Sequence, residues 1–300
     1  MHMYLKALRA WSLTASGLPV LLGNVLAYRD MSVQPAGTDD SSRPSVLILV
    51  LTLICVSFVH MAGNLINTYY DYKYGVDQHK QADDRTLVDH FLQPSEVSTL
   101  CLLFYSISLV SFLAVALLSS LRLEYSAFLF FVGLSGSFLY TGGMGFKYYA
   151  LGDILVLALF GPMAVTFSYM LQTGTFAIKT ALFAAPLAFG TEAILHCNNT
   201  RDIETDRRAG IRTIAIVLGR EWSYVLFCFL LFTPYIILSC PACKISMLIF
   251  LPYVTINEAF AIELKFRTQQ LDRLPERIKM LTLKFGLLYV SSILISFWIH

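Results

Sequence analysis

Long apolar runs separated by short polar segments make up most of this chain. Runs of about 20 residues are long enough to cross the hydrocarbon core of a bilayer as helices. We place nine such spans, at approximately 11–28, 46–70, 97–120, 125–141, 149–171, 177–197, 222–239, 245–263 and 281–299. The pattern predicts an all-α, polytopic membrane protein in which residues 1–300 form a single transmembrane domain.

Composition supports this class. Of the 300 residues, 56% are hydrophobic and 14% are charged, which excludes an ordinary soluble domain. The net charge of +2 gives no reason to expect nucleic-acid binding. The first apolar run begins after Arg9 and Trp11, which we interpret as interface anchors, and leads directly into further spans. We therefore expect no cleavable signal. Cys240 and Cys243 form a lone CxxC pair with no second ligand pair, which disfavours a zinc or redox role.

Basic residues are distributed unevenly between the two sides of the predicted bundle. With nine spans, the N-terminus and the even-numbered loops lie on one side and carry most of the 22 lysines and arginines. The other side holds only Arg29, Arg43, Arg122, Lys179 and Lys244. By the positive-inside rule, the N-terminus and the long polar loops face the cytosol.

A cluster of polar residues lies at the cytosolic end of the second span. Asn67 and Asp71 are four residues apart and share one face of a helix that Gly75 is expected to end. Asp77 then reaches back from a loop. Asp83, Asp84 and Arg85 follow in the same loop. Acidic residues next to an apolar span are costly, so they usually face a cavity and serve a site.

A second polar segment, much later in the chain, repeats this arrangement. Asn198, Asp202 and Asp206 occur at i, i+4 and i+8, which places them on one stripe of a helix. Each segment has an Asn, an Asp four residues later, a second Asp, a nearby Gly and a later Arg-Thr. Both segments fall on the predicted cytosolic side.

Acidic groups gathered on one membrane face can bind a transported cation, relay protons, or hold a divalent metal against a phosphorylated ligand. Mg²⁺ prefers oxygen ligands and is usually held by one or two carboxylates together with substrate phosphates. The two segments are accompanied by five basic residues that can neutralise phosphate: Lys73, Arg85, Lys147, Arg201 and Arg212. The third possibility therefore fits best, with a diphosphate bridged by two metal ions.

A glycine-rich turn lies between the two segments, within residues 140–153. Its glycines allow close backbone approach, and Lys147 is its one basic residue, well placed for phosphate. An ordinary interfacial turn with belt aromatics is the alternative. Aromatic faces near this turn could also stabilise an allylic cation. These aromatics are Tyr69, Tyr70, Tyr140, Phe146 and Tyr148.

The spacing of the two segments resembles that of the aspartate-rich motifs of UbiA-type intramembrane aromatic prenyltransferases. The motifs read Asn67-x3-Asp71-x5-Asp77 and Asp202-x3-Asp206. Residues 63–71, 83–89, 134–143 and 191–202 are similar to the animal members of this family, and the likeness extends over nearly the whole chain.

This resemblance implies nine helices around a central cavity that is open laterally to lipid and capped by cytosolic loops. It implies transfer of a geranylgeranyl group from geranylgeranyl diphosphate to menadiol, giving menaquinone-4, with Mg²⁺ as cofactor. It also implies residence in endoplasmic reticulum and Golgi membranes and sterol-dependent binding of HMG-CoA reductase.

The resemblance also implies roles for individual residues. The implied metal ligands are Asn67, Asp71, Asp77, Asn198, Asp202 and Asp206, supported by Asp83 and Asp84. The implied catalytic residues are the aspartates 71, 77, 202 and 206. The implied substrate-binding residues are Asn67, Lys73, Arg85, Lys147, Asn198, Arg201 and Arg212. Cleavage of the carbon–oxygen bond would create an allylic cation in a dry cavity, and the aromatic ring would attack it. The proton acceptor is open between Asp71 and Glu192.

Three alternatives accompany this interpretation. The acceptor could be 4-hydroxybenzoate, as in ubiquinone synthesis. The chain could instead be a regulatory partner of HMG-CoA reductase that senses a prenyl diphosphate. A secondary transporter needs polar residues on both faces. Only Asp30, Asp39, Asp40 and Glu124 of the 20 acidic residues lie on the far side, which disfavours that class.

Overall fold

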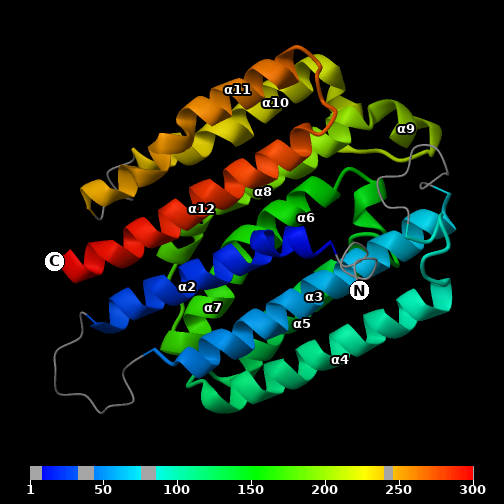
Figure 1. Cartoon of the computed structure of the whole chain (residues 1–300). Coiled ribbons are helices and arrows are strands. Elements are labelled where there is room, and N and C mark those ends of the chain that lie inside the picture. The colour runs from blue at the N-terminus through cyan, green and yellow to red at the C-terminus, as the bar shows by residue number, and fades with distance from the viewer. Residues whose placement is uncertain (1–8, 33–43, 76–85, 240–245, 300) are drawn as a thin grey trace.

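The computed structural model describes residues 9–32, 44–75, 86–239 and 246–299. The predictions for Asp77, Asp83, Asp84 and Arg85, and for Cys240 and Cys243, lie outside the described residues. Within the described part, the chain is a bundle of roughly parallel and antiparallel helices (Figure 1). The predicted all-α fold is confirmed.

The helices that build the bundle follow one another in this order: α2 (Thr14–Ser32), α3 (Val46–Lys73), α4 (Pro94–Leu118), α5 (Leu123–Leu139), the broken helix α6 (Gly152–Ala158), η4 (Leu159–Met163) and α7 (Ala164–Thr173), α8 (Lys179–Arg201), α10 (Ile214–Leu238), η6 (Met247–Thr255) with α11 (Ile256–Arg267), and α12 (Leu274–Ile299). Three short elements flank them: η1 (Ala10–Leu13), η3 (Phe146–Tyr148) and α9 (Ile203–Arg208).

Each of the nine predicted spans coincides with one helical segment. Among the described residues, seven segments are long and apolar enough to cross a membrane, and α5 is an apolar but shorter helix. Of the nine segments, α2 is the one that is neither among these seven nor a shorter apolar helix like α5. Helix α12 begins about two turns before its predicted span, because its first turns carry charged residues that a hydropathy pattern does not include. Helix α10 begins at Ile214, but Gly219 interrupts it with φ and ψ of 72° and 174°, and the segment after this kink is the one that matches the predicted span 222–239.

Helix α2 has a central position in the bundle, which explains its weaker apolar signal. It packs against α3, α7, α8 and α12, and it lies between α3 and α12 in Figure 1. Its buried face includes small and polar residues such as Ser16 and Gly23. A Cβ atom at Gly23 would lie 2.4 Å from the carbonyl oxygen of Val165 and 2.8 Å from Ser168 Cβ. The close approach of α2 to α7 therefore depends on glycine.

Replacing Gly23 with alanine should force α2 and α7 apart. We expect Gly23→Ala to destabilise the protein by about 1–3 kcal/mol, since an added methyl group meets backbone that cannot move aside easily. The measurement is the midpoint of thermal unfolding in detergent. Gly17→Ala is the matched control, because no atom lies within 4 Å of a Cβ at Gly17 in the same helix. An equal midpoint in both variants would contradict this account of the contact.

The break between α6 and α7 shapes the interior. Residues Leu159–Met163 form a π-turn around Pro162, which has no N–H to donate to a regular helical bond. A Cβ at Gly161 would lie 2.4 Å from Ala188 Cβ, so α8 packs directly against the break. The side chains of Leu159, Phe160 and Met163 then line a cavity.

The C-terminal ends of α3 and α8 carry the two polar segments. Helix α3 ends at Lys73, and Gly75 follows with a φ of 69°, as the sequence predicts. The predicted continuous stripe through Asp206 is wrong in one detail. Helix α8 ends at Arg201, and α9 begins after Asp202, whose φ and ψ are −94° and 10°. Backbone bonds from Asp202 N to Asn198 O and from Asp206 N to Asp202 O bridge the break. Asn198, Asp202 and Asp206 therefore keep their helical spacing across the break.

Candidate active site

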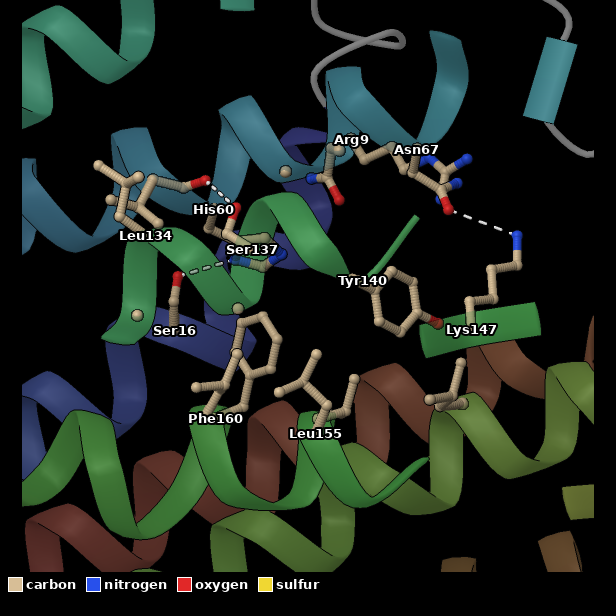
Figure 2. A pocket seen from close by; sticks show the side chains of 18 of the residues that line it. Arg9, Ser16, His60, Asn67, Leu134, Ser137, Tyr140, Lys147, Leu155 and Phe160 are labelled. Atoms are coloured by element: carbon tan, nitrogen blue, oxygen red, sulfur yellow. Dashed lines mark hydrogen bonds between the residues drawn. The ribbon is translucent and has the colours of Figure 1, made fainter. Parts of the chain in front are cut away.

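Both polar segments line one cavity of about 530 Å³. Asn67 and Asp71 reach it from α3, and Asn198, Asp202 and Asp206 reach it from α8 and α9. Below this polar mouth the walls are mostly apolar, with Leu134, Leu155 and Phe160 among the side chains in Figure 2. The structure thus brings together two segments that are far apart in the chain.

Asp71 is the best-anchored carboxylate of the site. Its side chain is buried, with 5% exposed. Lys147 Nζ lies 2.6 Å from Asp71 Oδ2 and 3.4 Å from Asn67 Oδ1. Tyr148 donates its hydroxyl to Asp71 Oδ1 at 3.0 Å. Figure 2 shows Lys147 extending toward Asn67. The predicted phosphate-binding lysine therefore contacts the first polar segment directly.

The glycine-rich turn positions Lys147 through its backbone. Gly145 has a φ of 61°, and a Cβ there would lie 2.5 Å from the Tyr148 ring. Lys147 N donates to Tyr140 O at 2.8 Å, which closes the turn. The turn is also joined to the segment after α9, because Ala150 N donates to Arg212 O at 2.6 Å and Arg212 N donates to Tyr148 O at 3.2 Å. Lys147 is thereby held between the two acidic segments.

The pKa values of two groups reflect this crowding. Burial raises the pKa of Asp206 to about 6, while Lys147 opposes the rise and Asp202 and Asp71 reinforce it. Burial also raises the pKa of the Tyr148 hydroxyl well above its ordinary value, with Asp71 adding to the shift. Tyr148 therefore remains a donor to Asp71. Partly buried carboxylates that oppose one another's ionisation are groups that a cation would stabilise.

Three predicted basic residues do not line the cavity. Lys73 is exposed, 5.7 Å from the Tyr70 ring centre. Arg201 makes two 2.7 Å bonds to the adjacent Asp202 carboxylate. The side chain of Arg212 is exposed, although its backbone joins the glycine-rich turn.

Two other arginines line the cavity and were not predicted to do so. Arg9, expected to be an interface anchor, lies beside Asn67 in Figure 2. Arg208 lies on α9, near Asp206. The sequence shows several arginines after Asn198, but only the turn at Asp202 determines which of them faces inward.

A buried polar cluster lies behind the wall of the cavity. Asn199, which lines the cavity, places its side-chain nitrogen 3.4 Å from both carboxylate oxygens of Asp153. His196 Nδ1 lies 3.8 Å from Asp153, and His196 Nε2 lies 3.0 Å from Ser223 O. This cluster ties the end of α8 to α6. Glu192 is buried but does not line the cavity, so it does not reach a ligand directly.

The oxygen atoms at the mouth suit magnesium. In the described part of the chain, no three His, Cys, Asp or Glu side chains are grouped as a self-sufficient metal centre. Mg²⁺ does not need such a centre, because it is commonly held by one or two carboxylates and completes its shell with phosphate oxygens and water. The carboxylates and amides of the two segments fit that requirement, provided that a phosphorylated ligand supplies the remaining oxygens.

Comparisons with known proteins agree with this geometry. The profile of the UbiA prenyltransferase family matches residues 18–288. UbiA prenyltransferase domain-containing protein 1 of Mus musculus is 48% identical over 98% of this chain and 84% of its own length. The Drosophila melanogaster homolog of that protein is 49% identical over 96% of this chain and 78% of its own length.

Solved structures with the same fold have low sequence identity. A UbiA homolog from Archaeoglobus fulgidus bound to GPP and Mg²⁺ aligns with a TM-score of 0.64 and 18% identity, covering 96% of this chain and 99% of the other. The apo structure of a UbiA homolog from Aeropyrum pernix aligns with a TM-score of 0.71 and 16% identity, covering 95% and 98%. At this level of sequence identity, the two similarities show a shared fold only.

Proposed function

Since the chain belongs to the UbiA prenyltransferase family, we propose that it transfers a geranylgeranyl group from geranylgeranyl diphosphate to menadiol, giving menaquinone-4. The chain is an integral membrane prenyltransferase of the UbiA type. One observation carries the proposal: acidic and amide side chains from both polar segments line a single cavity with Lys147 between them.

The mouth of the cavity is the proposed diphosphate site. Structures of the archaeal UbiA homolog are bound to GPP or DMAPP together with Mg²⁺, which supports a metal–diphosphate complex here. Bound Mg²⁺ would neutralise the diphosphate and stabilise it as a leaving group. The proposed ligands among the described residues are Asn67, Asp71, Asn198, Asp202 and Asp206. Asp77, Asp83, Asp84 and Arg85 belong to the proposal from sequence alone.

The residues at the mouth of the cavity and those in its interior have different roles in the proposed reaction. Lys147, Arg9 and Arg208 offer positive charge to the departing diphosphate. The apolar walls exclude water, which would otherwise capture the allylic cation as an alcohol. As the carbon–oxygen bond breaks, the electron pair leaves with the diphosphate. A ring carbon of menadiol then forms the new carbon–carbon bond and loses its proton, which gives the reduced quinol; separate oxidation of that quinol gives menaquinone-4.

The acceptor has one alternative with support from the structure. Arg9 lines the cavity close to Asn67, and an arginine there could hold the carboxylate of 4-hydroxybenzoate. Menadiol remains the proposed acceptor, because it is the one that the resemblance of residues 63–71, 83–89, 134–143 and 191–202 to animal members of the family implies. The two acceptors can be separated by direct competition.

We further propose that the protein resides in endoplasmic reticulum and Golgi membranes with the cavity mouth facing the cytosol. The excess of basic residues on the side that carries both polar segments supports this orientation. Sterol-dependent association with HMG-CoA reductase is the proposed partner interaction. A purely regulatory protein would bind the prenyl diphosphate without consuming it.

The test is a reaction with purified protein in detergent or nanodiscs. Geranylgeranyl diphosphate, menadiol held reduced, and Mg²⁺ should yield menaquinone-4, identified by mass spectrometry after oxidation. Chelation of the metal should stop the reaction. Preferential prenylation of 4-hydroxybenzoate in a mixture would overturn the proposed acceptor, and binding without any product would favour the regulatory alternative.

A further inference from the structure

A polar patch interrupts the apolar part of the cavity, well below the acidic mouth. It consists of Ser12 and Ser16 at the start of the chain and of His60 and Asn64 on α3, and we call it the His60 patch. Ser16, His60 and Asn64 line the cavity directly. Figure 2 shows His60 and Ser16 side by side, away from Lys147 and Asn67. The proposed diphosphate chemistry makes no use of these residues.

The hydrogen bonds of the patch form a chain with a defined direction. Asn64 Nδ2 donates to Ser12 Oγ at 3.1 Å, and Ser16 Oγ donates to Leu13 O at 3.1 Å. His60 Nδ1 lies 3.0 Å from Ser16 Oγ, and His60 Nε2 lies 3.3 Å from Ser12 Oγ. We assign the Ser16 proton to Leu13 O, and with that assignment a neutral His60 carries its proton on Nδ1 and donates to Ser16. Ser12 then donates to Nε2.

This direction determines what the patch can offer to a ligand. A serine hydroxyl has one proton and two lone pairs. With this assignment Ser16 donates its proton to Leu13 and accepts one bond from His60, which leaves one lone pair on the oxygen of a buried residue in the cavity wall. The patch therefore presents a hydrogen-bond acceptor. It suits a ligand O–H group, and it does not suit a carboxylate or a quinone carbonyl.

The position of the patch suits one hydroxyl of the acceptor. His60 precedes Asn67 by seven residues, or about 10.5 Å along α3 at the usual helical rise. The patch therefore lies about two helical turns from the proposed diphosphate site, in the part of the cavity that an aromatic acceptor beside the reacting end of the prenyl chain would occupy.

The neighbouring walls suit an aromatic ring. The rings of His60 and Phe160 meet edge to face, with centroids 4.7 Å apart and planes at 61°. Leu134 and Leu155 complete an apolar slot in Figure 2. Such a slot would hold a flat ring by contact and leave its orientation to a polar group.

We propose that the His60 patch is the subsite that orients the aromatic acceptor, with Ser16 Oγ accepting a hydrogen bond from one acceptor hydroxyl. The patch selects neutral hydroquinones over analogues that lack an O–H group at that position. This inference rests on the proposed function, since it assigns a subsite within the same cavity.

The test compares menadiol with its two monomethyl ethers at saturating geranylgeranyl diphosphate. A site built around a substrate hydroxyl discriminates against the analogue that lacks it. The wild-type protein should therefore use one of the ethers with a kcat/KM about three- to tenfold lower than that for menadiol. In Ser16→Ala, menadiol should fall to the level of that ether, and the KM for geranylgeranyl diphosphate should stay unchanged.

Two further variants make the comparison specific. Ser292→Ala is the matched control, because Ser292 is as buried as Ser16, donates to the carbonyl three residues earlier at 2.7 Å, and does not line the cavity. It should retain the wild-type preference. Ser16→Cys keeps nearly the same volume but replaces the oxygen with a weakly accepting sulfur. It should lose the preference as Ser16→Ala does.

Equilibrium binding of menadiol under reducing conditions separates the two possible failures. A Kd about three- to tenfold weaker in Ser16→Ala, with no change in Ser292→Ala, would support the subsite even if no product formed. Product formation with equal preference and equal Kd in wild type and Ser16→Ala would overturn the subsite while the proposed function stands. Absence of product with wild-type protein would overturn the proposed function alone.

Discussion

Asp71→Asn is expected to lower geranylgeranyl transfer by at least about 100-fold while leaving the protein folded. The amide keeps the shape of the side chain but removes the negative charge that Lys147 contacts at 2.6 Å. A neutral amide is a weak ligand for Mg²⁺ compared with a carboxylate, and Lys147 loses its partner in the resting site. The measurement is the rate of menaquinone-4 formation together with the thermal midpoint of the purified variant.

The opposite end of the bundle provides a closely matched control. Asp30 also contacts a lysine and a tyrosine: Lys179 Nζ lies 2.8 Å from Asp30 Oδ1, and Tyr169 donates to Asp30 Oδ2 at 2.6 Å. Asp30→Asn therefore removes the same kind of ion pair without touching the cavity. If both variants lost activity equally, the effect of Asp71 would be structural rather than catalytic.

Asp202→Asn is expected to produce a second loss of about 100-fold, from the other wall of the cavity. Asp202 lines the cavity at the junction of α8 and α9, and its carboxylate binds the Arg201 guanidinium with two 2.7 Å bonds. If the carboxylate holds metal, its loss should appear mainly as weaker Mg²⁺ affinity. A titration of activity against Mg²⁺ concentration should then shift to higher concentrations.

Glu204→Gln tests whether removing any negative charge near Asp202 is enough to lower activity. Glu204 is two residues from Asp202 but exposed, and its carboxylate lies 3.4 Å from Arg207 Nη1. Because it faces away from the cavity, we expect activity within about twofold of wild type, as for most exposed ion pairs. An unchanged Mg²⁺ titration in Asp202→Asn would remove Asp202 from the proposed metal ligands.

The fold could be predicted well from hydrophobic length alone. A span such as α4 has no charged residue after Glu96, so its existence follows from the bilayer thickness. The interruption at Leu159–Met163 and the kink in α10 at Gly219 are not visible in that pattern. The first depends on how Gly161 packs against Ala188, and the second on a glycine whose φ of 72° separates two helical segments.

The site could be predicted in its acidic residues but not in its basic ones. Carboxylates are rare beside apolar spans, so Asp71 and Asp202 stand out in the sequence. Arginines at a cytosolic boundary are common, because they also serve topology. Only the three-dimensional path of the chain separates Arg9 and Arg208, which line the cavity, from Arg212, which does not. Asp153 escaped notice because its partner Asn199 lies on another helix.

The backbone link between Ala150 and Arg212 determines when the site can be completed during synthesis. Ribosomes add about 5–20 residues per second, so Asp71 leaves the ribosome roughly 7–28 s before Arg212. Until the glycine-rich turn arrives, the nascent chain holds an acidic helix end without Lys147 or Tyr148 to stabilise it. An unpaired carboxylate beside an apolar span is costly, so α3 depends on later parts of the chain for its stability.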